Sequence, residues 1–193
     1  MNIVPQTVQK TPNGERYMDL YSRLLDDRII ILDGEVNDQM ASIVIAQLLY
    51  LEAQNPDEPI NMYINSPGGS VSAGLAIVDI MKTVKPDIVT IGTGLCASMA
   101  SVILACGTKG HRGILPNGEV MIHQPLGGAK GQSTDILITA RHIEKTRKRL
   151  VDIYADVTGK DPAEIDKDIE RDNWLGADEA IAYGLVDFVV QPH

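Results

Sequence analysis

The chain has 193 residues, of which 44% are hydrophobic and 4% aromatic, and its 26 acidic and 17 basic residues give a formal net charge of −9. This length suits a single domain with an aliphatic core, and the negative charge argues against a nucleic-acid-binding surface. The first residues lack a basic start followed by an apolar stretch, and no later segment is long and apolar enough to span a bilayer, so no membrane partner is expected.

Strands and helices are expected to alternate along the chain. In chain order we predict a strand at 29–32, a helix from Asn37 or Asp38 to about Gln54, a strand at 60–64, a helix from Val71 to about Thr83, a strand at 88–91, a helix at 97–105, and strands at 120–122 and 186–190. The first of these helices is apolar nearly all round, which predicts burial on most sides. Alternation of this kind indicates a parallel sheet with right-handed crossovers.

Ser98 lies where a nucleophile could be presented. It follows the strand at 88–91, which Gly92 and Gly94 are expected to break, and it opens an apolar helix. The first N–H groups of a helix have no partner inside the helix, so they can stabilise negative charge in front of the serine. By itself, however, a serine among small residues is more often a packing residue. Cys96, two positions earlier, is interpreted as a small buried hydrophobe rather than a rival nucleophile.

Two further segments could complete such a site. Ser66-Pro67-Gly68-Gly69 connects a strand to a helix, and its glycines could present another bare N–H, although an ordinary turn is the simpler interpretation. Among the histidines, His123 ends an apolar strand, whereas the other three are expected to be solvated: His111, His142 and His193. Reasoning from the residues alone leaves four candidate aspartates in the last third of the chain: Asp168, Asp172, Asp178 and Asp187.

Several segments, spaced in one order, together resemble the ClpP family, the proteolytic subunit of the ATP-dependent Clp protease. They are Ser66-Pro67-Gly68-Gly69, Ala97-Ser98-Met99, Met121-Ile122-His123-Gln124-Pro125-Leu126-Gly127-Gly128 and Arg171-Asp172-Asn173. The resemblance runs nearly end to end and implies one peptidase domain over residues 1–193, with a crotonase-like α/β spiral of βαβ units.

The resemblance also implies the roles of the site residues. Ser98 would be the nucleophile, His123 the base and Asp172 the carboxylate that orients the base. The backbone N–H groups of Gly68 and Met99 would form the oxyanion hole. These residue types are needed because a serine hydroxyl is a poor nucleophile until an imidazole takes its proton, and the imidazolium then needs a carboxylate.

A long helix is predicted from about Thr134 to Thr158, closed by Gly159, after an extended glycine-rich stretch at 124–131. At 1.5 Å per residue it would be about 37 Å long, too long for so small a domain to cover alone. The resemblance implies that residues 124–158 are a handle that stacks two seven-membered rings, with Glu170 and Arg171 forming ion pairs between rings. Without the resemblance, a helix lying over one protomer's sheet is the simpler interpretation.

The resemblance implies partners as well. Unfolded polypeptide would pair its backbone with edges near Gly69, Val71 and Leu126, and a hexameric Clp ATPase unfoldase would dock near Tyr63, while residues 1–17 form flexible axial loops. The sequence has no phosphate-binding loop, so ATP would belong to the unfoldase. We expect no cofactor and no metal, and two cysteines in apolar surroundings, Cys96 and Cys106, fit a cytoplasmic location.

Three functional hypotheses remain open. The first is a serine endopeptidase subunit of a barrel protease. The second is a weakly active or structural ring subunit, because Leu95, Cys96, Ala100 and Trp174 differ from residues expected in the family. The third is an acyl-CoA hydratase or isomerase on the shared fold, which the serine, histidine and aspartate together argue against.

Overall fold

A mostly parallel sheet forms the centre of the computed structural model, which describes residues 4–12 and 14–191. Within the described residues, five strands follow one another in the sheet, all parallel: β3 (Ile29–Asp33), β4 (Ile60–Ser66), β5 (Ile88–Ala97), β6 (Arg112–Ile114) and β9 (Phe188–Val189). β7 (Glu119–Ile122) also pairs in parallel with β5, and β8 (Asn173–Gly176) is antiparallel to β7. The α/β fold expected from the sequence is confirmed.

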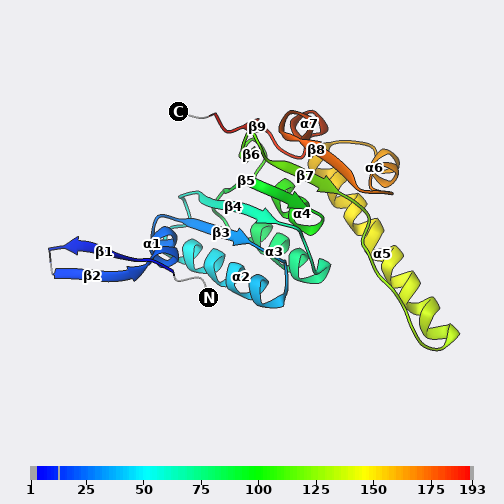
Figure 1. Cartoon of the computed structure of the whole chain (residues 1–193), viewed down its shortest axis with the longest axis horizontal. Helices are drawn as coiled ribbons and strands as arrows, with labels where there is room; N and C mark the ends of the chain where they lie inside the picture. The colour runs from blue at the N-terminus through cyan, green and yellow to red at the C-terminus, as the bar shows by residue number, and fades with distance from the viewer. Residues whose placement is uncertain (1–3, 13, 192–193) are drawn as a thin grey trace.

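Seven helices are described, and the longest projects away from the sheet (Figure 1). They are α1 (Leu20–Asp26), α2 (Asp38–Gln54), α3 (Val71–Thr83), α4 (Met99–Ala105), α5 (Ser133–Thr158), α6 (Pro162–Asp168) and α7 (Ala177–Tyr183). The Asn37 side chain caps α2 by accepting from the Met40 N–H, and Ser70 caps α3 by accepting from the Ala73 N–H. The expected bounds of these two helices are confirmed.

α2 is less buried than its apolar composition predicted. One face packs into the core through Ala41, Val44, Leu48 and Leu51. Its other face leaves Ile43 and Leu49 about half exposed. The prediction of burial on most sides is therefore wrong for the single chain, because one sheet has only one face to offer to a helix.

β5 continues through the two glycines that were expected to end it. It pairs with β6 up to Gly92 and with β7 from Leu95 onward, and its register against β4 shifts between Ile64 and Ser66. The Asn65 side chain accepts a hydrogen bond of 3.1 Å from the Leu95 N–H and so satisfies the backbone at this irregularity. The glycines therefore mark a bulge rather than a strand end, and β5 runs directly into Ser98.

α5 is buried only near its C-terminal end. Leu150, Val151 and Tyr154 lie in the core, whereas Leu137 and Ile138 near the other end are more than half exposed. The helix ends where predicted, at Gly159, which has the left-handed φ of 76° that favours glycine. The preceding segment 124–131 runs beside α5 without strand pairing, and together they extend from the body of the chain (Figure 1).

The N-terminal part of the chain extends from the opposite end of the sheet (Figure 1). β1 (Gln6–Thr11) and β2 (Gly14–Asp19) form an antiparallel hairpin, which includes most of the segment expected as an axial loop. Residues 1–3 and 13 of that segment lie outside the described residues.

Candidate active site

Ser98 lies at the junction between β5 and α4, in an unusual backbone conformation. Its φ is 55° and its ψ is −123°, in a region that residues with a side chain rarely occupy. The Ser98 N–H donates a 2.8 Å hydrogen bond to the Met121 carbonyl of β7, which fixes the turn against the sheet. A sharp, strained turn from strand to helix is the arrangement that exposes a nucleophilic hydroxyl.

His123 stands immediately after β7 and connects Ser98 to Asp172. Its Nε2 lies 2.8 Å from the Ser98 Oγ, and its Nδ1 lies 3.1 Å from the Asp172 Oδ1. The imidazole is 12% exposed, whereas the Asp172 side chain is 60% exposed. In the tautomer that satisfies both contacts, Nδ1–H donates to the carboxylate and Nε2 accepts the serine proton. These three side chains therefore have the geometry of an activated serine.

The other candidate aspartates are engaged elsewhere. Asp187 forms an ion pair with Arg112, and Asp168 accepts a hydrogen bond from the Tyr183 hydroxyl. Asp178 is an exposed residue in the first turn of α7. The structure thus brings Asp172, of these four, to His123.

Gly68 lies directly against the Ser98–Met99 peptide. A Cβ at position 68 would stand 2.6 Å from the Ala97 carbonyl oxygen and 2.9 Å from the Met99 nitrogen, and its φ of 88° also favours glycine. The Met99 N–H is the first of α4, so it has no partner within the helix. The backbone of Gly68 is therefore in close contact with the residues on both sides of Ser98.

The Gly68 N–H has a partner in this structure. It donates to the hydroxyl of the buried Ser66 over 3.1 Å. An oxyanion would have to share this N–H with Ser66 or displace its hydroxyl. Ser66 was not predicted to have a role, although its position two residues before Gly68 is typical of a hydroxyl that bonds nearby backbone.

Cys96 is turned away from this site. Its side chain is fully buried, its Sγ donates to the Ile64 carbonyl over 3.4 Å, and burial raises the pKa of the thiol to about 12. A thiol held in its neutral form is a poor nucleophile. The interpretation of Cys96 as a small buried hydrophobe is therefore consistent with its position.

The residues expected to bind substrate differ in exposure. Gly69 is exposed and forms a bridge with Val36, and Val71 begins α3 and is half-buried. Leu126 is 84% exposed in the segment that follows His123. Tyr63, expected at a docking surface, lies half-buried on β4 beside Ile31 of β3.

Glu170 has a partner within the chain, although it was expected to form an ion pair between rings. Its carboxylate lies 2.9 Å from the Nη2 of Arg147 on α5. The neighbouring Arg171 is exposed. Sequence reasoning did not single out Arg147, because nothing local distinguishes it from the other basic residues of the helix.

Comparison with known proteins decides the family. A family model described as Clp protease matches residues 12–193. The chain belongs to the Clp protease family. Among its relatives in this family, the ATP-dependent Clp protease proteolytic subunit of Ligilactobacillus salivarius (strain UCC118) is 58% identical over 191 residues, which cover 99% of this chain and 97% of that protein.

Residues 4–12 and 14–191 of this Clp protease contain neither a metal centre nor a helix that could span a membrane. No group of three or more histidine, cysteine, aspartate or glutamate side chains there is arranged to hold a metal ion. No helix in the same ranges combines the length and apolarity that crossing a membrane requires. Both cysteines are free thiols.

Proposed function

We propose that this chain is a serine endopeptidase subunit that hydrolyses peptide bonds through Ser98, His123 and Asp172. The observation that carries the proposal is the continuous pair of hydrogen bonds from the Ser98 hydroxyl through the His123 ring to the Asp172 carboxylate. Membership of the Clp protease family and the name of the 58% identical relative, a Clp protease proteolytic subunit, support the same reaction.

In this mechanism the Ser98 Oγ attacks the carbonyl carbon of the substrate while the His123 Nε2 takes the hydroxyl proton. Asp172 stabilises the resulting imidazolium, and the N–H groups of Met99 and Gly68 bind the oxyanion. His123 then protonates the leaving amine as the C–N bond breaks, which leaves an acyl-serine. Water, deprotonated by the same imidazole, hydrolyses that ester and restores the hydroxyl.

Substrate would bind as an extended chain beside the site. Gly69 and Val71 follow Gly68 closely in the chain, and Leu126 follows His123 by three positions. Backbone hydrogen bonds to such edges are largely independent of side chains, which suits a protease of broad specificity. Unfolded polypeptide is therefore the proposed substrate class.

Assembly and partners complete the proposal. The handle, residues 124–158, would stack two heptameric rings, and its exposed apolar residues support a contact with another copy. The relative is named as part of an ATP-dependent protease. By analogy, a hexameric Clp ATPase would dock near Tyr63 and feed in substrate past the N-terminal segment 1–17. The proposed location is the cytoplasm, where ATP is available to that partner.

The proposal is tested by hydrolysis of a short fluorogenic peptide by the purified chain, with its assembled mass measured in the same buffer. Ser98→Ala should reduce kcat by several orders of magnitude without changing the mass. Ser42→Ala is the matched control, because that serine is exposed on α2 and its hydroxyl bonds the Asp38 carbonyl of its own helix. Unchanged hydrolysis by Ser98→Ala would refute the proposal. An inactive wild-type chain of full mass would favour the structural ring subunit instead.

A further inference from the structure

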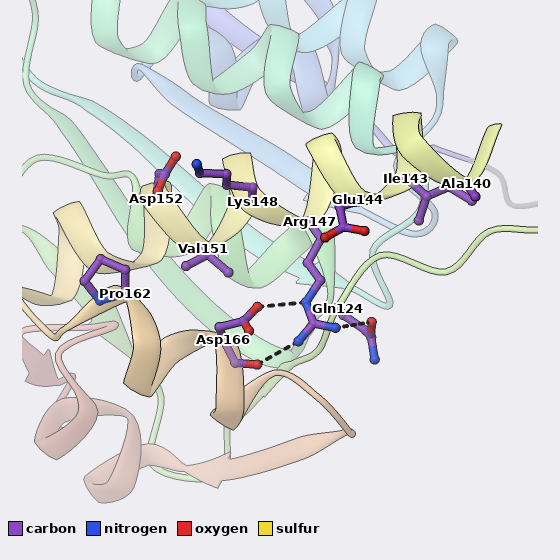
Figure 2. A pocket seen from close by; sticks show the side chains of 10 residues that line it. All are labelled: Gln124, Ala140, Ile143, Glu144, Arg147, Lys148, Val151, Asp152, Pro162 and Asp166. Atoms are coloured by element: carbon purple, nitrogen blue, oxygen red, sulfur yellow. Dashed lines mark hydrogen bonds and ion pairs between the residues drawn. The ribbon is translucent and has the colours of Figure 1, made fainter. Parts of the chain in front are cut away.

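Arg147, near the middle of α5, connects three parts of the chain. Its Nε donates to the Asp166 carboxylate over 2.8 Å and its Nη1 donates to the Gln124 side chain over 2.8 Å. Its Nη2 contacts the Asp166 carbonyl at 3.0 Å and the Glu170 carboxylate at 2.9 Å. Figure 2 shows the guanidinium between α6 and Gln124. Arg147 also lines a hollow of about 550 Å³ along α5.

Two of these partners adjoin residues of the candidate site. Gln124 follows His123 directly, and Glu170 precedes Asp172 by two positions. Gln124 also fastens the two segments to each other, because its backbone N–H donates to the Ile169 carbonyl over 2.6 Å and its side chain donates to the Glu170 carbonyl over 2.9 Å. Arg147 therefore holds the segment with the imidazole against the segment with the carboxylate.

The position of the Asp172 carboxylate depends on contacts that other residues make with its backbone segment. Its side chain is 60% exposed, and it meets the 12% exposed His123 through the 3.1 Å hydrogen bond. An exposed side chain is not fixed by packing, so its position follows the backbone that carries it. That backbone leaves α6 at Asp168 and is fastened by Gln124 and Arg147 before it reaches Asp172.

We propose that Arg147 is a positioning residue for the serine protease reaction: from its place on α5 it sets the distance between the His123 ring and the Asp172 carboxylate. This inference rests on the proposed function and deepens it. The guanidinium suits the task because it offers a planar set of donors in fixed directions, which lysine cannot reproduce. Arg147 does not touch the reacting atoms, and it acts through Gln124, Asp166 and Glu170.

Loss of the Arg147 contacts should affect turnover much more than the stability of the fold. The Arg147 side chain is 25% exposed, and its two acidic partners are each 53% exposed, so these ion pairs are partly screened by solvent. Their loss should therefore shift the unfolding midpoint little. A misplacement near 1 Å at a catalytic group, in contrast, can reduce turnover on the order of 100-fold.

The test compares Arg147→Gln, Arg147→Lys and the control Lys148→Gln, which removes the same charge from the next residue of the helix. Lys148 is exposed beside the same hollow. For each protein, the fraction with wild-type assembled mass is isolated, and kcat and KM are measured on a fluorogenic peptide. The rate of inactivation by a fluorophosphonate is measured in parallel, because it reports the reactivity of Ser98 without peptide binding.

For Arg147→Gln we expect kcat and the inactivation rate to fall together, by roughly 10-fold or more, while KM stays within about two-fold. Arg147→Lys should recover part of both losses, and Lys148→Gln should match the wild type within about two-fold. The inference is overturned if Arg147→Gln of wild-type mass retains both rates, or if it raises KM alone. Failure of the proposed function is a separate result, since it would appear as a wild-type chain of full mass that neither hydrolyses the peptide nor reacts with the fluorophosphonate.

Discussion

Ser98 is held in its strained conformation by contacts on both sides of the turn. Its N–H is bonded to Met121 of β7, and its carbonyl accepts from the Ser101 hydroxyl over 2.6 Å. Gly68 lies against its Cβ, at a distance that no side chain at position 68 would allow. The hydroxyl is thereby directed at His123 before any substrate arrives, which is the condition for efficient catalysis.

Gly68→Ala tests the contact between the two backbone segments. The new Cβ would stand 2.7 Å from the Ser98 Cβ, so the Gly68 amide would have to move away from Met99. Loss of one oxyanion donor typically costs about 3 kcal/mol, so kcat for a fluorogenic peptide should fall about 100-fold or more with KM little changed.

Gly176→Ala is a suitable control, because an added Cβ there would meet Glu179 at an ordinary 3.5 Å. Wild-type kcat in Gly68→Ala would show that the Gly68 N–H takes no part in the reaction. In that case its bond to Ser66 would be the whole of its function.

At the scale of elements, a chain of hydroxyl groups joins α5 to α4. The Tyr154 hydroxyl lies 2.7 Å from the Ser101 Oγ, which in turn donates to the Ser98 carbonyl. Both side chains are buried, at 1% and 0% exposed, and burial is also the main cause that raises the pKa of Tyr154. The tyrosine therefore stays neutral, and its O–H donates a hydrogen bond to the Ser101 hydroxyl.

Tyr154→Phe should weaken this junction without emptying the core. The ring stays and one buried hydrogen bond is lost, so the free energy of unfolding should fall by about 1 kcal/mol. Tyr154→Ala also creates a cavity and should cost about 3 kcal/mol or more. Denaturant titrations at a fixed protomer concentration measure both changes. Equal losses in the two variants would contradict this account of the contact.

Elements marked by an apolar run or a cap were predictable from sequence, and these include the short β7, in which Val120, Met121 and Ile122 are all apolar; β6 and β8 were missed. α3 has a clear apolar period and a serine cap, and its predicted bounds match the structure. In contrast, β6 and β8 have three and four residues, too few for a period, and their pairing depends on strands distant in sequence. The end of β5 was mispredicted because its continuation past Gly94 depends on a residue distant in sequence. The Asn65 side chain, 29 positions before Gly94, accepts a hydrogen bond from the Leu95 N–H.

The candidate site was predictable to a different degree at each residue. His123 could be selected from its place at the end of an apolar strand, and it lies next to Ser98. The choice of Asp172 came from the family resemblance, because aspartates are common and the residues alone left four candidates. Arg147 could not be found from sequence, since its partners lie 19 and 23 positions away in opposite directions.

At the scale of the whole molecule, Arg112 and Asp187 fasten the C-terminal segment to the core. Arg112 is 3% exposed and donates to both carboxylate oxygens of Asp187, while its Nη1 also reaches the Ala105 and Val157 carbonyls. Burial raises the pKa of Asp187, but the hydrogen bonds from Arg112 and Gly110 outweigh it and hold this pKa below its usual value.

Asp187→Asn should lower stability in a way that depends on pH. The pKa of Asp187 is lower in the folded chain than in the unfolded chain, so its contribution is complete above the unfolded value, about 3.9, and is lost as the pH falls through the folded value. Asp187→Asn should cost about 3 kcal/mol at pH 7.

The difference between Asp187→Asn and the wild type should then shrink in titrations below about pH 4. Asp178→Asn, at an exposed position on α7, should behave like the wild type throughout. A constant difference from pH 7 to pH 2 would contradict the role assigned to the ion pair.

The far end of α5 offers the apolar surface expected of an assembling subunit. Leu137 and Ile138 are 53% and 59% exposed there, far from the core residues of the same helix. Leu137→Asp should therefore lower the assembled mass, measured by light scattering, while the far-ultraviolet circular dichroism stays unchanged. Arg141→Gln, exposed on the same helix, is the control. Full-sized assemblies of Leu137→Asp would contradict the proposed role of the handle.

The account depends most on the reactivity of one hydroxyl. The direct measurement is to treat the native chain with a fluorophosphonate and locate the adduct by mass spectrometry of its peptides. We predict one adduct per chain, on Ser98, which disappears in His123→Ala and on prior unfolding. An adduct on another residue, or an unmodified Ser98 in a fully assembled and folded chain, would contradict the account.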